Sequence, residues 1–179
     1  MKPILFRVKE EIINGINYRL NGWTKTAEVI KKSGGYEGDI IIPETVVFNE
    51  RTYRVTSIGK EAFAFCDPLT SITIPNSVKR IGWKAFLDCE SLKEICIPNS
   101  IKSIRRHAFD GCDSLLSITY QGTMAQWKKI KLGYFWKIPI PTAVLHCTDG
   151  EQRIATIESM SSNTRYTIWN ANLFQGVAI

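Results

Sequence analysis

Apolar residues recur every 23 positions through the middle of this chain. Phe63, Phe86 and Phe109 follow one another at this step. The same step relates five further sets, which are Ile58, Ile81 and Ile104; Ala62, Ala85 and Ala108; Cys66, Cys89 and Cys112; Leu69, Leu92 and Leu115; and Ile72, Ile95 and Ile118. A unit of this length cannot bury its own apolar side, so the units must stack around one elongated core. The predicted fold is a repeat solenoid of 23-residue units.

Each unit reads as mainly β. Leu69, Ile72 and Ile74 end in the alternation that is typical of a half-buried strand. Pro75 then ends the strand, because proline has no amide hydrogen to donate. Residues 60–63 suit a short helical turn. The predicted coil is therefore mainly β with short helical turns.

The two ends of the array differ from the repeats, as the ends of a solenoid must. Residues 1–39 are predicted to form an N-terminal cap with a β-hairpin, whose turn is Asn21-Gly22. Residues 40–126 carry the repeats and include an inserted hairpin over 47–55. Residues 127–150 are predicted to close the array as a C-terminal cap, with Thr123 capping a short helix just before it.

Residues 151–179 form an extension with apolar residues at its end. A free apolar tail is a solubility hazard, so the extension is expected to be covered. One interpretation is that it packs on the C-terminal cap. The other is that it binds a partner or mediates self-association.

The stretch from Val55 to Val78, VTSIGKEAFAFCDPLTSITIPNSV, and the two copies after it resemble the repeat of the BspA-like leucine-rich repeat family of bacterial proteins. The resemblance covers roughly residues 12–150. It implies a right-handed leucine-rich-repeat-type coil with strands lining one face. It also implies a non-enzymatic role in interaction or adhesion, at the cell surface or after secretion.

Nothing in the sequence points to catalysis, a cofactor or a metal. The chain has 5 cysteines, three of them in one repeat slot, where parallel side chains predict a buried, reduced ladder. There is no Cys-x-x-Cys pair that could begin a zinc site. His107 and His146 have no evident catalytic partner, so no catalytic residue is predicted.

The exposed strand positions are the predicted binding surface. They lie between the buried positions of each main strand and form a small, mostly uncharged ladder suited to a protein or a glycan. The predicted residues are Ser71, Thr73, Glu94, Cys96, Ser117 and Thr119.

A basic stripe is the alternative surface. Residues 79–137 hold eleven Lys and Arg against five Asp and Glu, which accounts for the whole net charge of +6. Its repeated members are Lys79, Arg80, Lys84, Lys102, Arg105 and Arg106, which Lys128, Lys129, Lys131 and Lys137 extend. With Trp83, Tyr134, Phe135 and Trp136 nearby, the stripe suits an anion-directed module that binds nucleic acid. A solvated basic face is the simpler interpretation.

Two kinds of compartment fit the sequence. No apolar run is long enough to span a bilayer. Residues 1–10 do not read as a secretory signal, because Arg7 and Lys9 interrupt the apolar stretch. Family resemblance favours the cell surface, whereas reduced cysteines also suit the cytoplasm.

Overall fold

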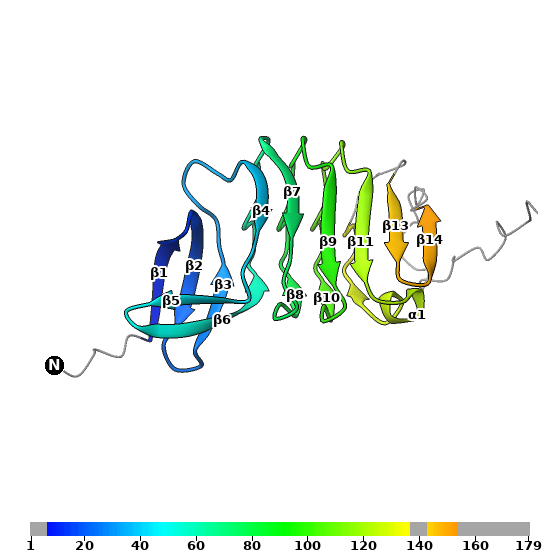
Figure 1. Cartoon of the computed structure of the whole chain (residues 1–179). Helices are drawn as coiled ribbons and strands as arrows, with labels where there is room; N and C mark the ends of the chain where they lie inside the picture. The colour runs from blue at the N-terminus through cyan, green and yellow to red at the C-terminus, as the bar shows by residue number, and fades with distance from the viewer. Residues whose placement is uncertain (1–6, 137–142, 154–179) are drawn as a thin grey trace, which may run out of the picture.

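Two β-sheets run along two sides of a stack of coils (Figure 1). The computed structural model describes residues 7–136 and 143–153. The six-stranded sheet has the order β14-β13-β11-β9-β7-β4. Its strands are β4 (Gly38–Ile41), β7 (Leu69–Thr73), β9 (Glu94–Pro98), β11 (Ser117–Gln121), β13 (Val144–Cys147) and β14 (Gly150–Arg153).

The eight-stranded sheet joins the N-terminal strands to the return strands of the coils, in the order β1-β2-β3-β6-β8-β10-β12, with β5 paired to β6. Its strands are β1 (Val8–Ile13), β2 (Ile16–Asn21), β3 (Thr26–Val29), β5 (Thr45–Phe48), β6 (Arg51–Ile58), β8 (Arg80–Ile81), β10 (Ser103–Ile104) and β12 (Lys131–Leu132). No helix in the described ranges is both long and apolar enough to cross a membrane.

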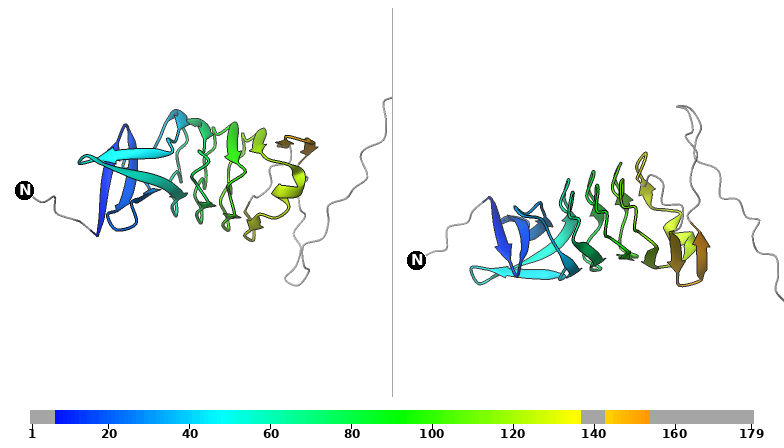
Figure 2. Two further views of the ribbon diagram at one scale, coloured as in Figure 1. Left: turned by 60° about the horizontal axis from the view of Figure 1, so that its bottom comes forward. Right: turned by 90° about the horizontal axis from the view of Figure 1, so that it is seen from above.

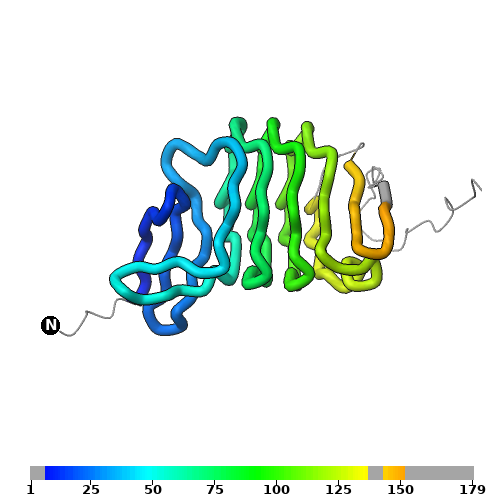
Figure 3. Tube along the Cα trace, in the orientation of Figure 1, coloured from blue at the N-terminus to red at the C-terminus, as the bar shows by residue number. Residues whose placement is uncertain are grey.

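The predicted stacking register is confirmed. Parallel pairing places Ile95 beside Ile72 on one side and Ile118 on the other. In the eight-stranded sheet, Ile81 pairs with Ile58 and Ile104 in the same way. Successive coils therefore lie directly over one another, as the trace in Figure 3 shows.

The third side of the coil consists of turns, and the short helical turn predicted over residues 60–63 is absent there. Glu61 has a left-handed φ of 53°, which no α-helix contains. The amide groups of Glu61 and Phe63 donate to carbonyl groups of the next coil, at Trp83 (2.9 Å) and Ala85 (2.7 Å). These amides serve the stacking of coils, so they are not free for bonds within a helix. Within the described ranges the one α-helix is α1 (Met124–Trp127), and Thr123 caps it as predicted.

An aromatic column runs through the core. The rings of Phe86 and Phe109 have centroids 5.0 Å apart and planes 3° apart. Tyr36 packs on Phe63 at the N-terminal end of the column, with centroids 4.6 Å apart. Trp136 packs edge-on against Phe109 at the other end, at 6.2 Å. Both ends of the repeat column are thus covered by aromatic rings from outside the repeats.

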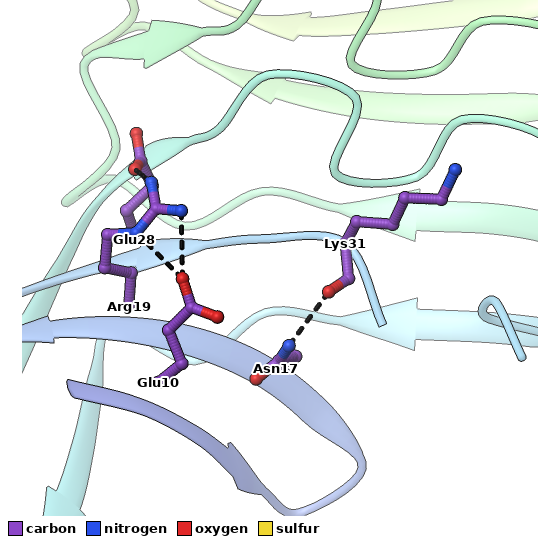
Figure 4. A network of polar contacts seen from close by, with 5 residues as sticks. All are labelled: Glu10, Asn17, Arg19, Glu28 and Lys31. Carbon is purple, nitrogen blue, oxygen red and sulfur yellow. Dashed lines mark hydrogen bonds and ion pairs between the residues drawn. The ribbon is translucent and has the colours of Figure 1, made fainter. Parts of the chain in front are cut away.

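The N-terminal cap is a three-stranded antiparallel sheet in which β2 and β3 form the predicted hairpin. The additional strand, β1, pairs with β2 through a turn at Asn14-Gly15, where both residues have positive φ. Polar side chains link these strands, as Figure 4 shows. Arg19 of β2 forms ion pairs with Glu10 of β1 (3.0 Å) and Glu28 of β3 (3.1 Å). Asn17 donates to the Lys31 carbonyl at 2.8 Å in the same view.

The inserted hairpin is also confirmed. Strands β5 and β6 pair antiparallel, and Asn49 and Glu50 form their turn with φ of 47° and 60°. The hairpin projects from the coils toward the N-terminal strands (Figure 2). Two predictions concern residues outside the described ranges. One is the place of Lys137 in the basic stripe, and the other is the packing of residues 154–179 of the C-terminal extension.

Candidate binding surfaces

Two rows of side chains run across the outward face of the six-stranded sheet. Strand pairing aligns one row, which is Asp39, Ser71, Glu94, Ser117 and Val144. The other row is Ile41, Thr73, Cys96, Thr119 and His146. We call them the strand-face rows. All six residues predicted from the sequence lie in these rows and are brought together on one surface.

The centre of the strand-face rows is shallow. A hollow of about 170 Å³ is lined by Ser71, Ile72, Thr73, Glu94, Ile95, Cys96 and Thr119. Thr73, Glu94 and Thr119 are exposed, whereas Ser71, Cys96 and Ser117 are partly buried. Burial raises the pKa of the Cys96 thiol, so this group is protonated at neutral pH. The face offers hydroxyl groups and one carboxylate for contact, without a deep cavity.

Four members at the ends of these rows were missed from the sequence. Asp39 accepts hydrogen bonds from the hydroxyl groups of Thr70 (2.6 Å) and Ser71 (2.8 Å), and these bonds lower its pKa. Ile41 is 75% exposed. Val144 and His146 extend the rows at the other end. The similarity of residues 40–43 to 72–75 was the available signal, because it places Ile41 in the slot of Thr73.

A larger hollow lies on the eight-stranded side, among the return strands. It has a volume of about 600 Å³, and we call it the basic groove. Its lining residues are Glu28, Ile58, Gly59, Lys60, Arg80, Gly82, Trp83, Arg105, Arg106, Gly133 and Tyr134. Of the predicted stripe, three arginines line the groove, whereas Lys79, Lys84 and Lys102 do not.

The aromatic residues near the stripe differ in how accessible their rings are for stacking on a ligand. Trp83 is partly buried, and the ammonium groups of Lys60 and Lys84 lie 4.6 Å and 4.8 Å from its ring centroid. Trp136, which the sequence placed among rings that could stack on a ligand, is buried in the core against Phe109 and Trp127. That assignment was wrong, because the chain after α1 turns inward and closes the aromatic column.

The cysteine ladder is buried and unbridged. The thiol of Cys89 donates to the Phe63 carbonyl and that of Cys112 to the Phe86 carbonyl, both at 3.0 Å. A hydrogen bond with Cys89, together with burial, raises the pKa of Cys112 well above its ordinary value. These thiols pack as small apolar groups and satisfy carbonyl oxygens between coils.

Both histidines contact a carboxylate, contrary to the expectation from the sequence. His107 Nδ1 lies 3.1 Å from Asp110, three residues later in the same turn. His146 Nδ1 lies 2.9 Å from Glu151, its cross-strand neighbour in the β13–β14 pair. Among the described residues, the hydrogen bonds of the two rings go to carboxylates and not to a hydroxyl or thiol. Among residues 7–136 and 143–153, no three acidic, His or Cys side chains converge to hold a metal ion.

Comparison with known proteins agrees with this architecture. The profile of the BspA type leucine-rich repeat region matches residues 44–148 in 6 copies. A leucine-rich repeat protein from Bacteroides capillosus is 25% identical, with a TM-score of 0.62, over 77% of this chain and 97% of its own. No curated protein matches the chain.

Two further solved structures share the fold. The leucine-rich repeat protein of T. pallidum is 24% identical with a TM-score of 0.59, over 76% of this chain and 59% of its own length. A leucine-rich cell surface protein from Faecalibacterium prausnitzii is 25% identical with a TM-score of 0.51, over 70% of this chain and 42% of its own. The chain therefore spans little more than half of the first protein and less than half of the second.

Proposed function

Because the chain belongs to the BspA-type leucine-rich repeat family, we propose that it is a non-enzymatic interaction module that binds a protein or a glycan through the strand-face rows. The repeat architecture supports the general role, since stacked repeats create extended surfaces for macromolecules. The rows are a part of that surface on which side chains are aligned coil after coil.

One observation carries this proposal: polar or small side chains occupy the same two registered positions on three neighbouring strands, β7, β9 and β11. Ser71 pairs across to Glu94 and then Ser117, while Thr73 and Thr119 flank Cys96. Adjacent strands are about 4.8 Å apart, so the hydroxyl groups of β7 and those of β11 stand about 9.6 Å apart, with Glu94 and Cys96 of β9 between them. Together these side chains form a set of hydrogen-bond donors and acceptors. Such a set suits the peptide groups of a protein or the hydroxyl groups of a sugar.

The shape of the face supports binding more than catalysis. Its hollow of about 170 Å³ is smaller than the roughly 300–1,000 Å³ that is usual for small-molecule sites. The exposed side chain of Ile41 adds an apolar contact at one end. A broad, shallow surface that combines polar side chains with an exposed apolar one suits a non-obligate interface, which as a whole is about as polar as the rest of a protein surface.

We further propose that the module acts in adhesion at a cell surface. The similarity to the F. prausnitzii cell surface protein supports this step, although the chain covers only 42% of that protein. Uncharged polar contacts hold in the presence of salt, which suits adhesion in an ionic environment.

The test is to place two bulky charged side chains on the rows. Wild-type protein is first screened against a printed glycan array and a phage-displayed peptide library. The ligands obtained are then measured with a Thr73→Arg/Thr119→Arg variant, which should bind at least tenfold more weakly, since both threonines are exposed on the rows.

The matched control is Thr45→Arg/Thr52→Arg, which adds the same two charges at exposed positions of the β5–β6 hairpin. It should bind as the wild type does. Circular dichroism and thermal melting verify that both variants remain folded. Ligands that bind the row variant undiminished, or the absence of any ligand from both collections, would contradict the proposal.

A further inference from the structure

The basic groove is a second surface, built by the close approach of glycine residues in neighbouring coils. A Cβ added to Gly82 would lie 2.5 Å from the carbonyl oxygen of Gly59. A Cβ added to Gly133 would lie 2.3 Å from the amide nitrogen of Arg106. At both positions the backbones are too close for any side chain. Part of the groove lining is therefore backbone at Gly59, Gly82 and Gly133, and the arginines lie at its margins.

Positive charge at these margins has no ion-pair partner among the described residues. Arg80, Arg105 and Arg106 line the groove, and in the part of the chain that the structure describes none of them forms an ion pair. The one acidic lining residue is Glu28, which already bonds to Arg19 (3.1 Å) and to the Ser57 hydroxyl (3.2 Å). Clustered guanidinium groups without acidic partners repel one another and favour an anionic ligand.

The chemistry of the margins restricts which anion fits. Guanidinium groups form paired hydrogen bonds with the oxygens of planar or tetrahedral anions. The groove is open to solvent and has a volume of about 600 Å³, so a short stretch of an extended chain can lie in it. Arg80 lies on β8, whereas Arg105 and Arg106 directly follow β10 of the next coil, so the positive charges are spread along the stack and suit an extended polyanion.

Single-stranded nucleic acid is the less suitable polymer. Proteins bind it by stacking bases on open aromatic rings, in addition to contacting phosphates. The ring of Trp83 is already in contact with the ammonium groups of Lys60 and Lys84. Tyr134 is an exposed ring in the lining, at 70% exposure, but one such ring is fewer than the series of platforms on which successive bases stack. Charge recognition by the arginines is therefore the stronger feature of the groove.

We propose that the basic groove binds a segment of a linear sulfated polysaccharide. Arg80 and Arg105 contact sulfate groups, and the charge of Arg106 adds to the electrostatic attraction for the anionic chain. This site is separate from the strand-face rows. The two surfaces lie on different sheets, so one can bind while the other is vacant.

The probe is a fluorescein-labelled heparin octasaccharide, and fluorescence anisotropy gives its affinity. Wild-type protein should bind it, with binding that weakens steeply as salt is added. The fully desulfated, N-acetylated octasaccharide should bind at least tenfold more weakly. Arg80→Ala/Arg105→Ala should also lose at least tenfold and show a shallower salt dependence, and it should stay folded because both side chains are exposed.

The matched control is Arg54→Ala/Lys93→Ala, which removes two positive charges at exposed positions outside the groove. Its affinity should change by less than threefold. An equal loss in both double variants would mean that only net charge matters and would overturn the proposal. Failure of the wild type to bind the octasaccharide would overturn it as well.

Two further measurements locate the site and exclude the other polymer. In ¹⁵N NMR spectra, the octasaccharide should shift the amide signals of Gly82 and Trp83 and leave those of Thr73 and Thr119 unchanged. Shifts confined to the threonines would place the ligand on the strand-face rows and overturn this inference alone. Tighter binding of a 20-nucleotide oligo(dT) or of duplex DNA than of the octasaccharide would assign the groove to nucleic acid instead.

Discussion

The rings of Phe63 and Phe86 lie almost parallel, with centroids 5.1 Å apart and planes 7° apart. Phe109 continues the stack on the other side of Phe86 at 5.0 Å. Each ring is fully buried. The middle ring therefore packs on two neighbours at once, and it joins three coils that are held together otherwise by backbone hydrogen bonds and aliphatic contacts.

Removing the middle ring should be costly. Phe86→Ala is expected to lower the free energy of unfolding by about 3–5 kcal/mol, since it deletes a buried ring and leaves a cavity between coils. Denaturant unfolding followed by circular dichroism measures this change. Phe65→Ala is the control, because that ring is 58% exposed and its loss should cost less than about 1 kcal/mol. A similar small cost for Phe86 would contradict the packed column.

Adding one methyl group between coils should also destabilise the fold. Gly82→Ala would place its Cβ 2.5 Å from the Gly59 carbonyl carbon and oxygen and 2.8 Å from the Lys60 amide nitrogen. All of these are backbone atoms, so the coils must separate. We expect a loss of about 1–3 kcal/mol in the free energy of unfolding. Thr73→Ala, at an exposed position, should change it by less than about 0.5 kcal/mol.

The sequence predicted the interior of the array better than its ends, for a physical reason. Phe86 and Ile95 have counterparts at 23-residue steps, so their burial could be read from repetition. Tyr36 and Trp136 complete the same column but stand outside that step, because the chain takes a different path at each end. Trp136 was assigned to the surface since the local sequence around it is basic and no repeat copies it.

In the candidate surfaces, too, some residues could be predicted from the local sequence pattern and others could not. Thr73 and Thr119 were predicted because strand alternation sets which side chains face outward. Glu28 could not be placed beside the groove from its sequence, since its position depends on how β3 pairs with β6, where the register shifts between Ala27 and Glu28. The groove itself results from glycine contacts between coils, which become visible only when the coils are stacked.

The reactivity of each cysteine toward an alkylating reagent should depend on how exposed its thiol is. Cys66, Cys89 and Cys112 are buried, whereas Cys96 and Cys147 are partly exposed. In the native protein, iodoacetamide should therefore modify the latter two and spare the ladder. Burial raises the pKa of both partly exposed thiols, so their alkylation should be slower at neutral pH than that of a free thiol and accelerate as the pH rises.

Mass spectrometry after a timed reaction identifies the modified residues. In denaturant all of the cysteines should react at similar rates, which serves as the control. Rapid native modification of Cys89 would contradict its place between coils, where its thiol donates to the Phe63 carbonyl.

The pKa of Asp39 should lie below its ordinary value. Hydrogen bonds from the hydroxyl groups of Thr70 and Ser71 stabilise its ionised form and lower its pKa from the ordinary value of 3.8. The ionised carboxylate then favours the folded state at pH values above 3.8. That contribution is lost as the pH falls through the lower, folded-state pKa. NMR titration of the Asp39 side-chain carboxyl carbon measures the midpoint directly.

A double variant, Thr70→Ala/Ser71→Ala, removes both donors and should raise the Asp39 midpoint toward 3.8. Thr119→Ala lies on the same face without bonding to Asp39, so it should leave the midpoint unchanged. An Asp39 midpoint that is the same in the wild type and the double variant would show that the hydroxyl groups do not hold the carboxylate. It would then be free to rotate, and the end of the strand-face rows would lack the fixed negative charge that the structure gives it.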